Sequence, residues 1–562
     1  MLTLHRGLFG PLSAVLFMAL ANGMAAAQES AYASCDEMLP LPRVVRDAQI
    51  GPASCLMQEA ELTYKNRSYM RVDLGLDGAV EGFVTREGDY HEYLTNAPEL
   101  VFPQAQASAP QQPVFAVARY ERARGAAILL LYPQRRRDWN GKLWVTAHGR
   151  GRSFRNGSLK TWHQYLDPED PLADLNKLQK AMLSLGYAVA VTRRTSEESV
   201  GEILATLEDG TIVDFVAFND SHSLIKDYTR VAENVLAERL GKAPERTFLY
   251  GKSAGARLAR GMNYFGYRLN VDSDGKPIFD GFLVDDSAAG TWLPVVIEEG
   301  KDTLLDEDDE KAAFVPQLEL AHQAYWNFNN HDLPEFVTYS FLANKYNNAR
   351  ILMEKGMTDK FRLIEIRQLS HDGGSTRPDG RNGKLQMLDL SLLMEGAINL
   401  LDAWVAGGAA PLSRSDYPPI GDVDNDGAID NPAIAYPEVA CPLGIFYPYP
   451  RSGSGATSWA AFTGNGIEPR DEHGVFVDMN GNGLWDFRET PAEAWQRLGL
   501  LDHGEELTRP RYVDCVGDAA AALADAGLFD PATVAEYVRR AQAQNLEPAS
   551  DEEHALIYFS RF

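Results

Sequence analysis

The sequence predicts an α/β fold built on a mainly parallel sheet with flanking helices, and two observations lead to that expectation. Short apolar or alternating runs recur along the chain, as the strands of a buried sheet do. Amphipathic helical segments separate several of these runs, and strands that alternate with helices favour a parallel sheet. The runs expected to form strands are 69–74, 126–131, 143–147, 186–192, 247–250, 282–284 and 361–366. Helices are expected through Leu224, Tyr228, Val231 and Val235, and over 385–405, where Gly407 and Gly408 end the second one.

Residues 1–27 are typical of a secretory signal peptide. A short segment with His5 and Arg6 precedes an apolar run over 12–21, and three alanines at 25–27 form a small-residue cleavage site. The apolar run is too short to span a membrane comfortably, and no other stretch of the sequence resembles a membrane span. We therefore expect a secreted or periplasmic protein that has no membrane contact after signal cleavage.

Composition divides the remainder of the chain into three parts. Residues 28–140 are expected to be a β-rich lead-in packed on the core, 141–406 the α/β core, and 407–562 an extension packed back on the core. Residues 290–345 are polar and irregular, and we expect them to form a lid inserted over the site. The extension is rich in Pro, Gly, Asp and Asn and ends in amphipathic helices. Length alone would equally allow two separate domains.

The four cysteines and the net charge restrict the surroundings of the protein. Four cysteines fit an oxidising compartment, and closeness in sequence favours the bridges Cys35–Cys55 and Cys441–Cys515, although other pairings are possible. No Cys-x-x-Cys motif indicates a zinc or redox site. The formal net charge of −26 argues against nucleic acid or an anionic membrane as a partner.

The motif that carries chemistry follows the run 247–250. Residues 251–255 read G-x-S-x-G, and a helical segment follows directly. This is the pattern of a nucleophile elbow, in which small neighbours let the backbone turn sharply and expose the serine oxygen. We therefore expect Ser253 to be the nucleophile and the N–H of Ala254 to face a developing oxyanion. The alternative is a chance match, because the motif alone is common.

A base and an acid are expected later in the chain. His371 follows the run 361–366 and opens a glycine-rich loop, so the chain order serine, acid, histidine makes it the expected base. Asp285 and Asp286 end the run 282–284 and are the candidate acids, with Asp286 preferred and Asp285 nearly equal. Either aspartate could instead be a helix cap or a loop charge. The other expected position, after the next strand, falls near 344–348, where no carboxylate occurs.

A second part of the oxyanion hole is expected after the run 143–147. His148 is followed by Gly149, Arg150 and Gly151, which is similar to the glycine-rich oxyanion loop of esterases. The N–H of Gly149 or Arg150 would then share the oxyanion with Ala254. The alternative is an ordinary turn from strand to loop.

Two stretches of the extension resemble calcium-binding loops. The first matches the full EF-hand spacing, with Gly at the sixth position. Its expected ligands are Asp478, Asn480, Asn482, Asp486, Glu489 and the carbonyl of Leu484. The second repeats the first half of the pattern with Asp422, Asp424, Asp426 and Asp430, but Ala433 replaces the bidentate glutamate. A fragmentary third set at 270–275 reads as a turn. Because no long helices flank the loops, we expect a structural Ca²⁺ rather than a sensor.

Together these motifs resemble those of the secreted bacterial "alpha/beta hydrolase domain" proteins, an esterase-like family. The resemblance rests on the elbow at 251–257, the segment 272–281, the Pro-rich motif 436–444 and the helices at 512–541. It implies an α/β-hydrolase fold over most of 140–545. This chain departs from the family at Asn344, where the family has a carboxylate, and in the loop at 478–489. The architecture is also similar to tannases and feruloyl esterases, although their cysteine pair beside the triad is absent here.

These observations favour a secreted serine hydrolase that cleaves a small-molecule carboxylic ester through a Ser-His-Asp triad and an acyl-enzyme. No organic cofactor is expected. Within enzymes, the alternative is a peptidase or acyltransferase that uses the same triad. Outside them, the alternative is a calcium-stabilised secreted binding protein with a degenerate triad. A fluorophosphonate probe separates the two classes, because it labels only an activated serine.

Overall fold

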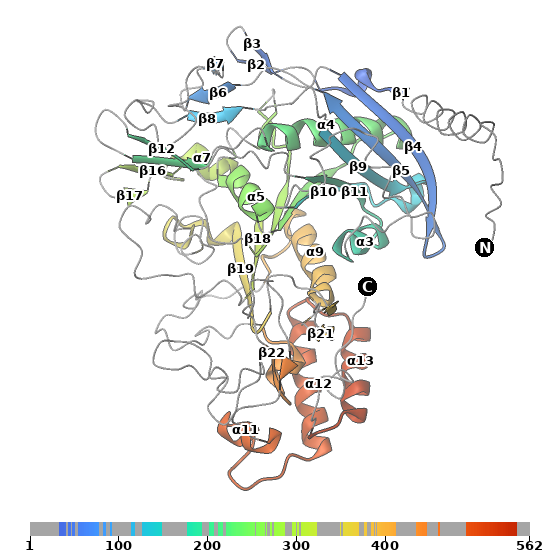
Figure 1. Ribbon diagram of the computed structural model, residues 1–562, viewed down its shortest axis with the longest axis vertical. Coiled ribbons are helices and arrows are strands. Elements are labelled where there is room, and N and C mark those ends of the chain that lie inside the picture. The colour runs from blue at the N-terminus through green and yellow to red at the C-terminus, as the bar shows by residue number, and fades with distance from the viewer. Residues whose placement is uncertain are drawn as a thin grey trace, which may run out of the picture.

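The structure of the protein is a computed structural model. It describes residues 33–40, 54–77, 126–148, 177–193, 221–252, 254–264, 275–286, 305–322, 352–369, 390–411, 434–446 and 490–547, with short strands and single positions between them. A ten-stranded sheet lies at its centre (Figure 1). In spatial order its strands are β1 (Ala33–Ser34), β4 (Ser54–Tyr64), β5 (Arg67–Asp77), β9 (Ala126–Pro133), β11 (Ala188–Arg193), β10 (Lys142–His148), β14 (Arg246–Lys252), β15 (Gly281–Asp285), β18 (Gln317–His322) and β19 (Phe361–Ile366).

Helices and small sheets surround this central sheet. The described helices are η1 (Asp36–Met38), η4 (Arg136–Asp138), α3 (Lys177–Ser184), α4 (Ser221–Leu240), α5 (Ala254–Tyr264), α7 (Asp308–Ala313), η8 (Met357–Asp359), α9 (Ser391–Val405), α10 (Pro437–Ala440), α11 (Pro491–Arg497), α12 (Arg509–Asp525) and α13 (Pro531–Ala543). The strands outside the central sheet are β2 (Arg43–Val45), β3 (Ala48–Ile50), β6 (Gly82–Thr85), β7 (Tyr90–Glu92), β8 (Val114–Val117), β12 (Glu202–Thr206), β13 (Ile212–Val216), β16 (Val295–Glu298), β17 (Lys301–Asp302), β20 (Thr376–Pro378), β21 (Lys384–Gln386), β22 (Ile445–Phe446) and β23 (Trp459–Ala460).

The strand order of the central sheet reverses at β10. From β10 the chain crosses to β11 on one side and later returns to β14 on the other, and both pairings are parallel. The sheet continues in parallel through β15, β18 and β19, whereas β9, β5, β4 and β1 pair antiparallel. In open α/β sheets, ligands bind outside the carboxyl ends of the strands at such a reversal. The fold therefore marks the carboxyl ends of β10 and β14 as the place to look for a site.

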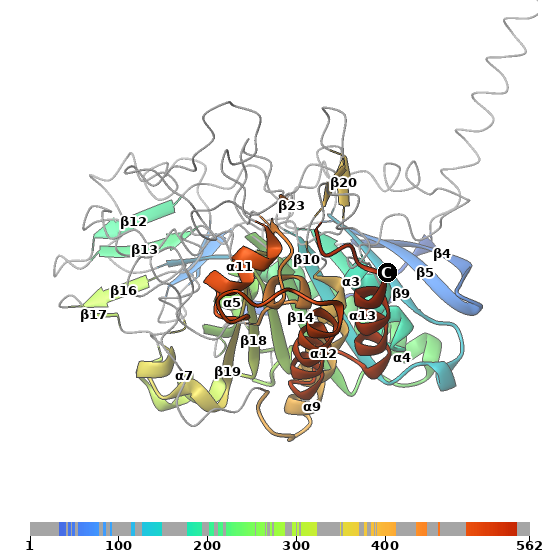
Figure 2. The ribbon, with the colours of Figure 1, turned by 90° about the horizontal axis from the view of Figure 1, so that it is seen from below.

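Helices cover both faces of the sheet (Figure 2). α4 and α5 pack on one face, against strand residues such as Leu249 and Val284. α3 and α9 pack on the other face around Trp144 and Phe248, whose rings stack with centroids 4.8 Å apart. Trp144 and Val145 belong to opposite faces, as the two-residue period of a strand requires. Burial on both faces explains why these strands are visible in the sequence as apolar runs.

The described part of the C-terminal extension packs on α9. A Cβ added to Gly396 of α9 would lie 2.5 Å from the Cα and the carbonyl oxygen of Leu528, which follows α12. Trp495 of α11 donates its indole N–H to the carbonyl of Pro442 at 2.7 Å. α12 and α13 lie side by side beyond α9 (Figures 1 and 2). The extension thus shares an apolar core with α9 and one face of the sheet.

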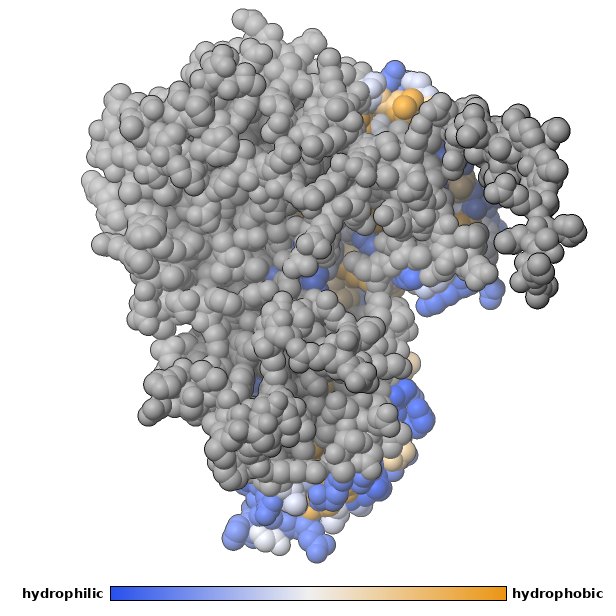
Figure 3. Space-filling model, viewed as in Figure 1, coloured by the Kyte–Doolittle hydropathy of each residue, from blue (hydrophilic) through white to orange (hydrophobic). Residues whose placement is uncertain are grey.

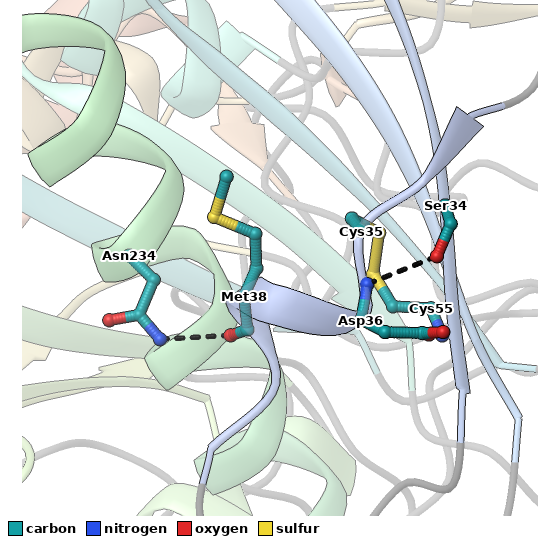
Figure 4. The surroundings of a disulfide bond; sticks show 6 residues. All are labelled: Ser34, Cys35, Asp36, Met38, Cys55 and Asn234. Atoms are coloured by element: carbon teal, nitrogen blue, oxygen red, sulfur yellow. Dashed lines mark hydrogen bonds between the residues drawn. A yellow bond between two sulfur atoms is a disulfide. The ribbon is translucent and has the colours of Figure 1, made fainter.

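Both predicted disulfides are present. Cys441 is bonded to Cys515 of α12. Cys35 is bonded to Cys55 of β4, and both are fully buried (Figure 4). Asn234 of α4 donates to the carbonyl of Met38 at 2.8 Å, which fastens η1 to the helix layer (Figure 4).

Three sequence expectations need correction. Residues 28–140 were expected as a lead-in, yet they contribute β1, β4, β5 and β9 to the central sheet itself. The expected lid at 290–345 contains β18, a fully buried sheet strand, so the expectation is wrong for 317–322. The helix expected to begin at 385 begins at 391, because 384–386 pair with β20 as strand β21. The segment 323–348 lies outside the described residues.

The described surface is mainly hydrophilic on the face shown in Figure 3. Among the described residues, Leu56 of β4 is a large apolar residue that is exposed, with 42 % of its surface accessible. No described helix is both long and apolar enough to cross a membrane.

Candidate active site at the carboxyl edge of the sheet

A sharp turn joins β14 to α5. A Cβ built on Gly251 would lie 2.1 Å from the carbonyl oxygen of Gly255, so no larger residue fits at position 251 without moving the backbone. The predicted strand and helix are both present, over 246–252 and 254–264. A strand, a sharp turn and a helix around G-x-S-x-G are the structural context of a nucleophile elbow.

The strands around this turn end at one edge of the sheet. His148 of β10 is paired with Lys252 of β14, and Lys252 is paired with Asp285 of β15. β18 and β19 also end together, with His322 opposite Ile366. The segments expected to supply the oxyanion hole, the nucleophile, the acid and the base therefore all follow strands that end at this edge.

Asp285 is fully buried at the end of β15, and both of its carboxylate oxygens have close contacts. Tyr250 donates its hydroxyl to Oδ2 at 2.6 Å, and Lys252 Nζ lies 3.6 Å from the same oxygen. Oδ1 lies 2.8 Å from His322 Nε2. Burial alone would raise the pKa of Asp285, but the charge of Lys252 and the contacts of His322 and Tyr250 outweigh it and hold that pKa well below its usual range.

Tyr250 complements this carboxylate. Burial raises the pKa of the Tyr250 hydroxyl well above its ordinary value, and the charges of Asp285 and Asp286 raise it further. The hydroxyl therefore keeps its proton and serves as a donor. Asp285 is thus an ionised group whose charge is balanced inside the fold.

Asp286 has a different environment. Its backbone is left-handed, with φ of 46°, and its N–H donates to the carbonyl of Leu320 at 2.9 Å. Oδ1 accepts the backbone N–H of His322 at 3.1 Å, and Oδ2 lies 3.5 Å from His322 Nδ1. One nitrogen of the His322 ring therefore faces Asp285 and the other faces Asp286.

A buried polar network ties α5 to β18. Arg260 of α5 forms an ion pair with Glu319 of β18, and both side chains are fully buried. Gln317 donates to Glu319 at 3.3 Å, and Asn263 donates to Gln317 at 3.1 Å. Removing either partner of a buried ion pair leaves an uncompensated charge, which is strongly destabilising. The network therefore holds the elbow helix against the strand that ends at His322.

Residues 434–446, which we call the strap, lie along the end of β19. The N–H of Ile434 donates to the carbonyl of Glu365 at 2.8 Å, and the N–H of Arg367 donates to the carbonyl of Ile434 at 3.0 Å. Gln368 has a left-handed φ of 55°, and its side-chain oxygen accepts the N–H of Phe446 at 2.9 Å. Cys441, in the middle of the strap, forms the disulfide with Cys515 of α12. The strap thus holds the chain just before the segment expected to carry the base.

Several predicted site residues lie outside the described residues. These are Ser253, His371, Gly149 and Arg150, and the expected calcium ligands Asp422, Asp424, Asp426, Asp430, Asp478, Asn480, Asn482, Leu484, Asp486 and Glu489. The backbone of Ala254 begins α5. Asp285 and Asp286 are described and lie together with His322. Within the described part of the chain, no group of three His, Cys, Asp or Glu side chains is arranged to hold a metal ion.

The sequence patterns gave no role to His322. One signal was available, since residues 317–320 alternate polar and apolar and a histidine follows at 322, as in a strand leading to a site. In the fragmentary third calcium pattern, Asp272 Oδ1 accepts the N–H of Lys276 at 2.9 Å, and Oδ2 accepts from Arg230 at 2.8 Å.

Comparison with protein-family models finds no match, and comparison with curated proteins finds none either. Similar solved structures include MGS-M1, an α/β hydrolase enzyme from a Medee basin deep-sea metagenome library, at 13 % identity over 50 % of this chain and 93 % of that chain, with a TM-score of 0.29. Esterase Est22 matches at 14 % identity over 44 % and 69 %, with a TM-score of 0.24. Carboxyl esterase 2 of the mycorrhizal fungus Tuber melanosporum matches at 13 % identity over 43 % and 70 %, with a TM-score of 0.24. TM-scores this low support no inference about the site of this chain.

Proposed function

We propose that this protein is a secreted serine hydrolase of the α/β-hydrolase fold that cleaves carboxylic esters. The observation that carries the proposal is the turn between β14 and α5. There the backbones of Gly251 and Gly255 lie so close together that a side chain at position 251 would overlap Gly255. That turn lies at the carboxyl edge of the sheet, beside the reversal of strand order at β10. Both features belong to the context in which a G-x-S-x-G serine acts as a nucleophile.

In the proposed mechanism, Ser253 Oγ attacks the ester carbonyl carbon and His371 takes the serine proton. The N–H of Ala254 and that of Gly149 or Arg150 stabilise the tetrahedral oxyanion. When the intermediate collapses, the alcohol leaves with the proton from His371 and an acyl-enzyme remains. A water molecule deprotonated by His371 then releases the carboxylic acid and restores the serine.

The environment of the two aspartates supports Asp286 as the acid. The oxygens of Asp285 already have contacts at 2.6 and 2.8 Å, and Lys252 balances its charge. The contacts of Asp286 with His322 are longer, at 3.1 and 3.5 Å. A carboxylate has about four lone-pair sites, so Asp286 can accept hydrogen bonds from more than one residue, and we propose that His371 is one of them. We therefore assign Asp285 to the support of the edge and Asp286 to the triad.

Export and calcium binding belong to the same proposal. Two disulfides support an oxidising compartment, and the sequence of residues 1–27 supports a cleaved signal. The EF-hand spacing at 478–489 supports one structural Ca²⁺ in the extension. No organic cofactor enters the mechanism.

The test is hydrolysis of a panel of p-nitrophenyl esters, from short acyl chains to aromatic acids, together with labelling by a fluorophosphonate. We expect Ser253→Ala to lose labelling and about 10⁴-fold or more of kcat, the scale of a lost triad member. Ser184→Ala is the control, because this serine bonds the carbonyl of Lys180 in α3 and lies outside the proposed site. Normal hydrolysis by Ser253→Ala would refute the proposal. A folded wild-type protein that is neither labelled nor active would favour the binding-protein alternative, and activity on amides alone would favour a peptidase.

A further inference from the structure

We propose that His322 is a positioning residue, which holds Asp286 in the orientation of the triad acid and joins it to Asp285. The inference rests on the proposed function, because it assigns how the acid of that same site is held. It concerns a residue to which the sequence pattern gave no role.

Three contacts of His322 converge on the two carboxylates. Its backbone N–H donates to Asp286 Oδ1 at 3.1 Å, and its Nδ1 lies 3.5 Å from Asp286 Oδ2. Its Nε2 lies 2.8 Å from Asp285 Oδ1. All three side chains are fully buried, so these contacts are not weakened by competition with bulk water. One residue of β18 thus spans two consecutive residues of β15.

The same geometry argues against His322 as the base. A general base needs one ring nitrogen within hydrogen-bond reach of the nucleophile. Both nitrogens of His322 already face carboxylates. Its effect on catalysis would therefore pass through Asp286, which is the definition of a positioning role.

Asp286 is a residue that needs to be held. Its φ of 46° is uncommon for a residue other than glycine, and such backbone persists where the surroundings over-determine it. Asp286 forms two hydrogen bonds with β18. Its N–H donates to the carbonyl of Leu320, and its Oδ1 accepts the N–H of His322. The end of β18 therefore sets both the backbone and the carboxylate of Asp286.

Charge gives His322 a second effect on the same pair. Two adjacent carboxylates at a buried edge repel each other, and a neighbouring charge of the same sign raises a carboxyl pKa. Among the described residues, Tyr250 and Lys252 on β14 approach Asp285, His322 on β18 approaches both aspartates, and β19 places the apolar Ile366 opposite His322. Removing the imidazole takes away one of the groups that hold the pKa of Asp285 low, so that pKa should rise.

Two amide variants separate the roles of the two ring nitrogens. Asparagine places an N–H donor near Nδ1 and can keep the contact with Asp286, whereas glutamine places one near Nε2 and can keep the contact with Asp285. We expect His322→Gln to lower kcat by about 100-fold, the scale of a misplacement of about 1 Å, with KM little changed. The acidic limb of its kcat/KM profile should move to higher pH. His322→Asn should keep kcat within about ten-fold of the wild type, because the retained contact with Asp286 keeps the acid oriented.

Activity is expressed per serine titrated by fluorophosphonate, so that a smaller folded fraction does not count as a loss of kcat. Equal kcat and an unchanged acidic limb in both variants would overturn the inference, as would a larger loss in the asparagine variant. If the His322 variants are inactive and His371→Ala is active, His322 is the base and the inference is wrong. An active Ser253→Ala variant would overturn the proposed function and this inference together, whereas an inactive one with unchanged His322 variants overturns this inference alone.

Discussion

The backbones of Gly251 and Gly255 approach each other so closely that a methyl group on Gly251 would lie 2.1 Å from the Gly255 carbonyl oxygen. Both groups are backbone or directly attached to it, so rotation of a side chain cannot relieve the overlap. The contact therefore controls the angle at which β14 meets α5.

Gly251→Ala should consequently cost about 1–3 kcal/mol of stability through overpacking, together with most of the fluorophosphonate labelling. Gly517→Ala in α12 is the matched control, because its added Cβ would meet Val538 at an ordinary 3.5 Å. That control should be neutral or more stable by up to about 1 kcal/mol, since alanine is the better helix former. Thermal melts and labelling of both variants make the comparison. A labelled, stable Gly251→Ala protein would show that the backbone around position 251 leaves room for a side chain.

The two aspartates should fail in different ways. Asp286→Asn should lower kcat by about 10⁴-fold, as expected for the acid of a triad, with a small effect on stability. Asp285→Asn should mainly lower stability, because it replaces the anion that Lys252 and Tyr250 surround. If Asp285→Asn is the inactive variant instead, the two assignments must be exchanged.

The stability effect of Asp285→Asn should depend on pH in a defined direction. The folded-state pKa of Asp285 is held below its unfolded value, so its ionisation stabilises the protein above the unfolded pKa. That contribution is lost as the pH falls through the folded-state pKa. The difference in melting temperature between wild type and variant should therefore be full at neutral pH and shrink in strong acid. A difference that grows on acidification would contradict the balanced charge of Asp285.

Two buried tyrosines form a matched pair for testing the carboxyl edge of the sheet, where the proposed triad lies. Tyr250 donates to Asp285 at 2.6 Å, and Tyr187 donates to Asp402 at 2.7 Å near the opposite edge of the sheet. Each change to phenylalanine removes a donor from a carboxylate and should cost about 1–3 kcal/mol. Only Tyr250→Phe should also change the pH profile of kcat/KM, because it alters the charge pair beside the proposed triad. Equal pH profiles in the two variants would argue against an electrostatic link between Tyr250 and the site.

The two disulfides offer a similar comparison. Replacing either cysteine pair by alanine should lower stability by about 2–4 kcal/mol, the usual range for a lost bridge. The Cys441–Cys515 bridge holds the strap, which bonds the chain just before the expected base, whereas Cys35–Cys55 fastens η1 to β4. We therefore expect kcat per titrated serine to fall in the first double variant and to stay near wild type in the second. Equal kcat in both would mean that the strap does not position the base.

Removal of calcium should lower the melting temperature, because an ion bound only by the folded state stabilises that state. The variant Glu489→Gln, which removes the expected bidentate carboxylate, should show the same lower melting temperature without EDTA. Asp430→Asn tests the weaker second loop. Activity should be lost mainly through unfolding, so kcat below the transition should be unchanged. A melting temperature that EDTA leaves unchanged, with no calcium in the purified protein, would remove the site from the proposal.

Local patterns in the sequence determined most of the central sheet and the elbow. A strand buried on both faces is usually apolar along its length, so the runs at 126–131, 143–147 and 247–250 predicted β9, β10 and β14 directly. The glycines of the elbow were predictive for a similar reason, because a turn this tight excludes other residues at position 251. The closeness in sequence of Cys35 to Cys55, and of Cys441 to Cys515 in comparison with the rest, likewise predicted the disulfides.

Only the tertiary structure decided what lies at the edge of the sheet beside that elbow. The first four residues of β18 alternate polar and apolar, which by itself favours a strand with one solvent-exposed face, yet the whole strand is buried. Its polar side chains can be buried because Arg260, on a helix distant in sequence, bonds Glu319, and the aspartates of β15 contact His322. Sequence order alone left Asp285 and Asp286 nearly equal as candidates, with Asp286 preferred, since they are neighbours after the same strand. They differ because Tyr250 donates to Asp285 and Lys252 forms an ion pair with it, and such contacts between separate strands exist only once the sheet has formed.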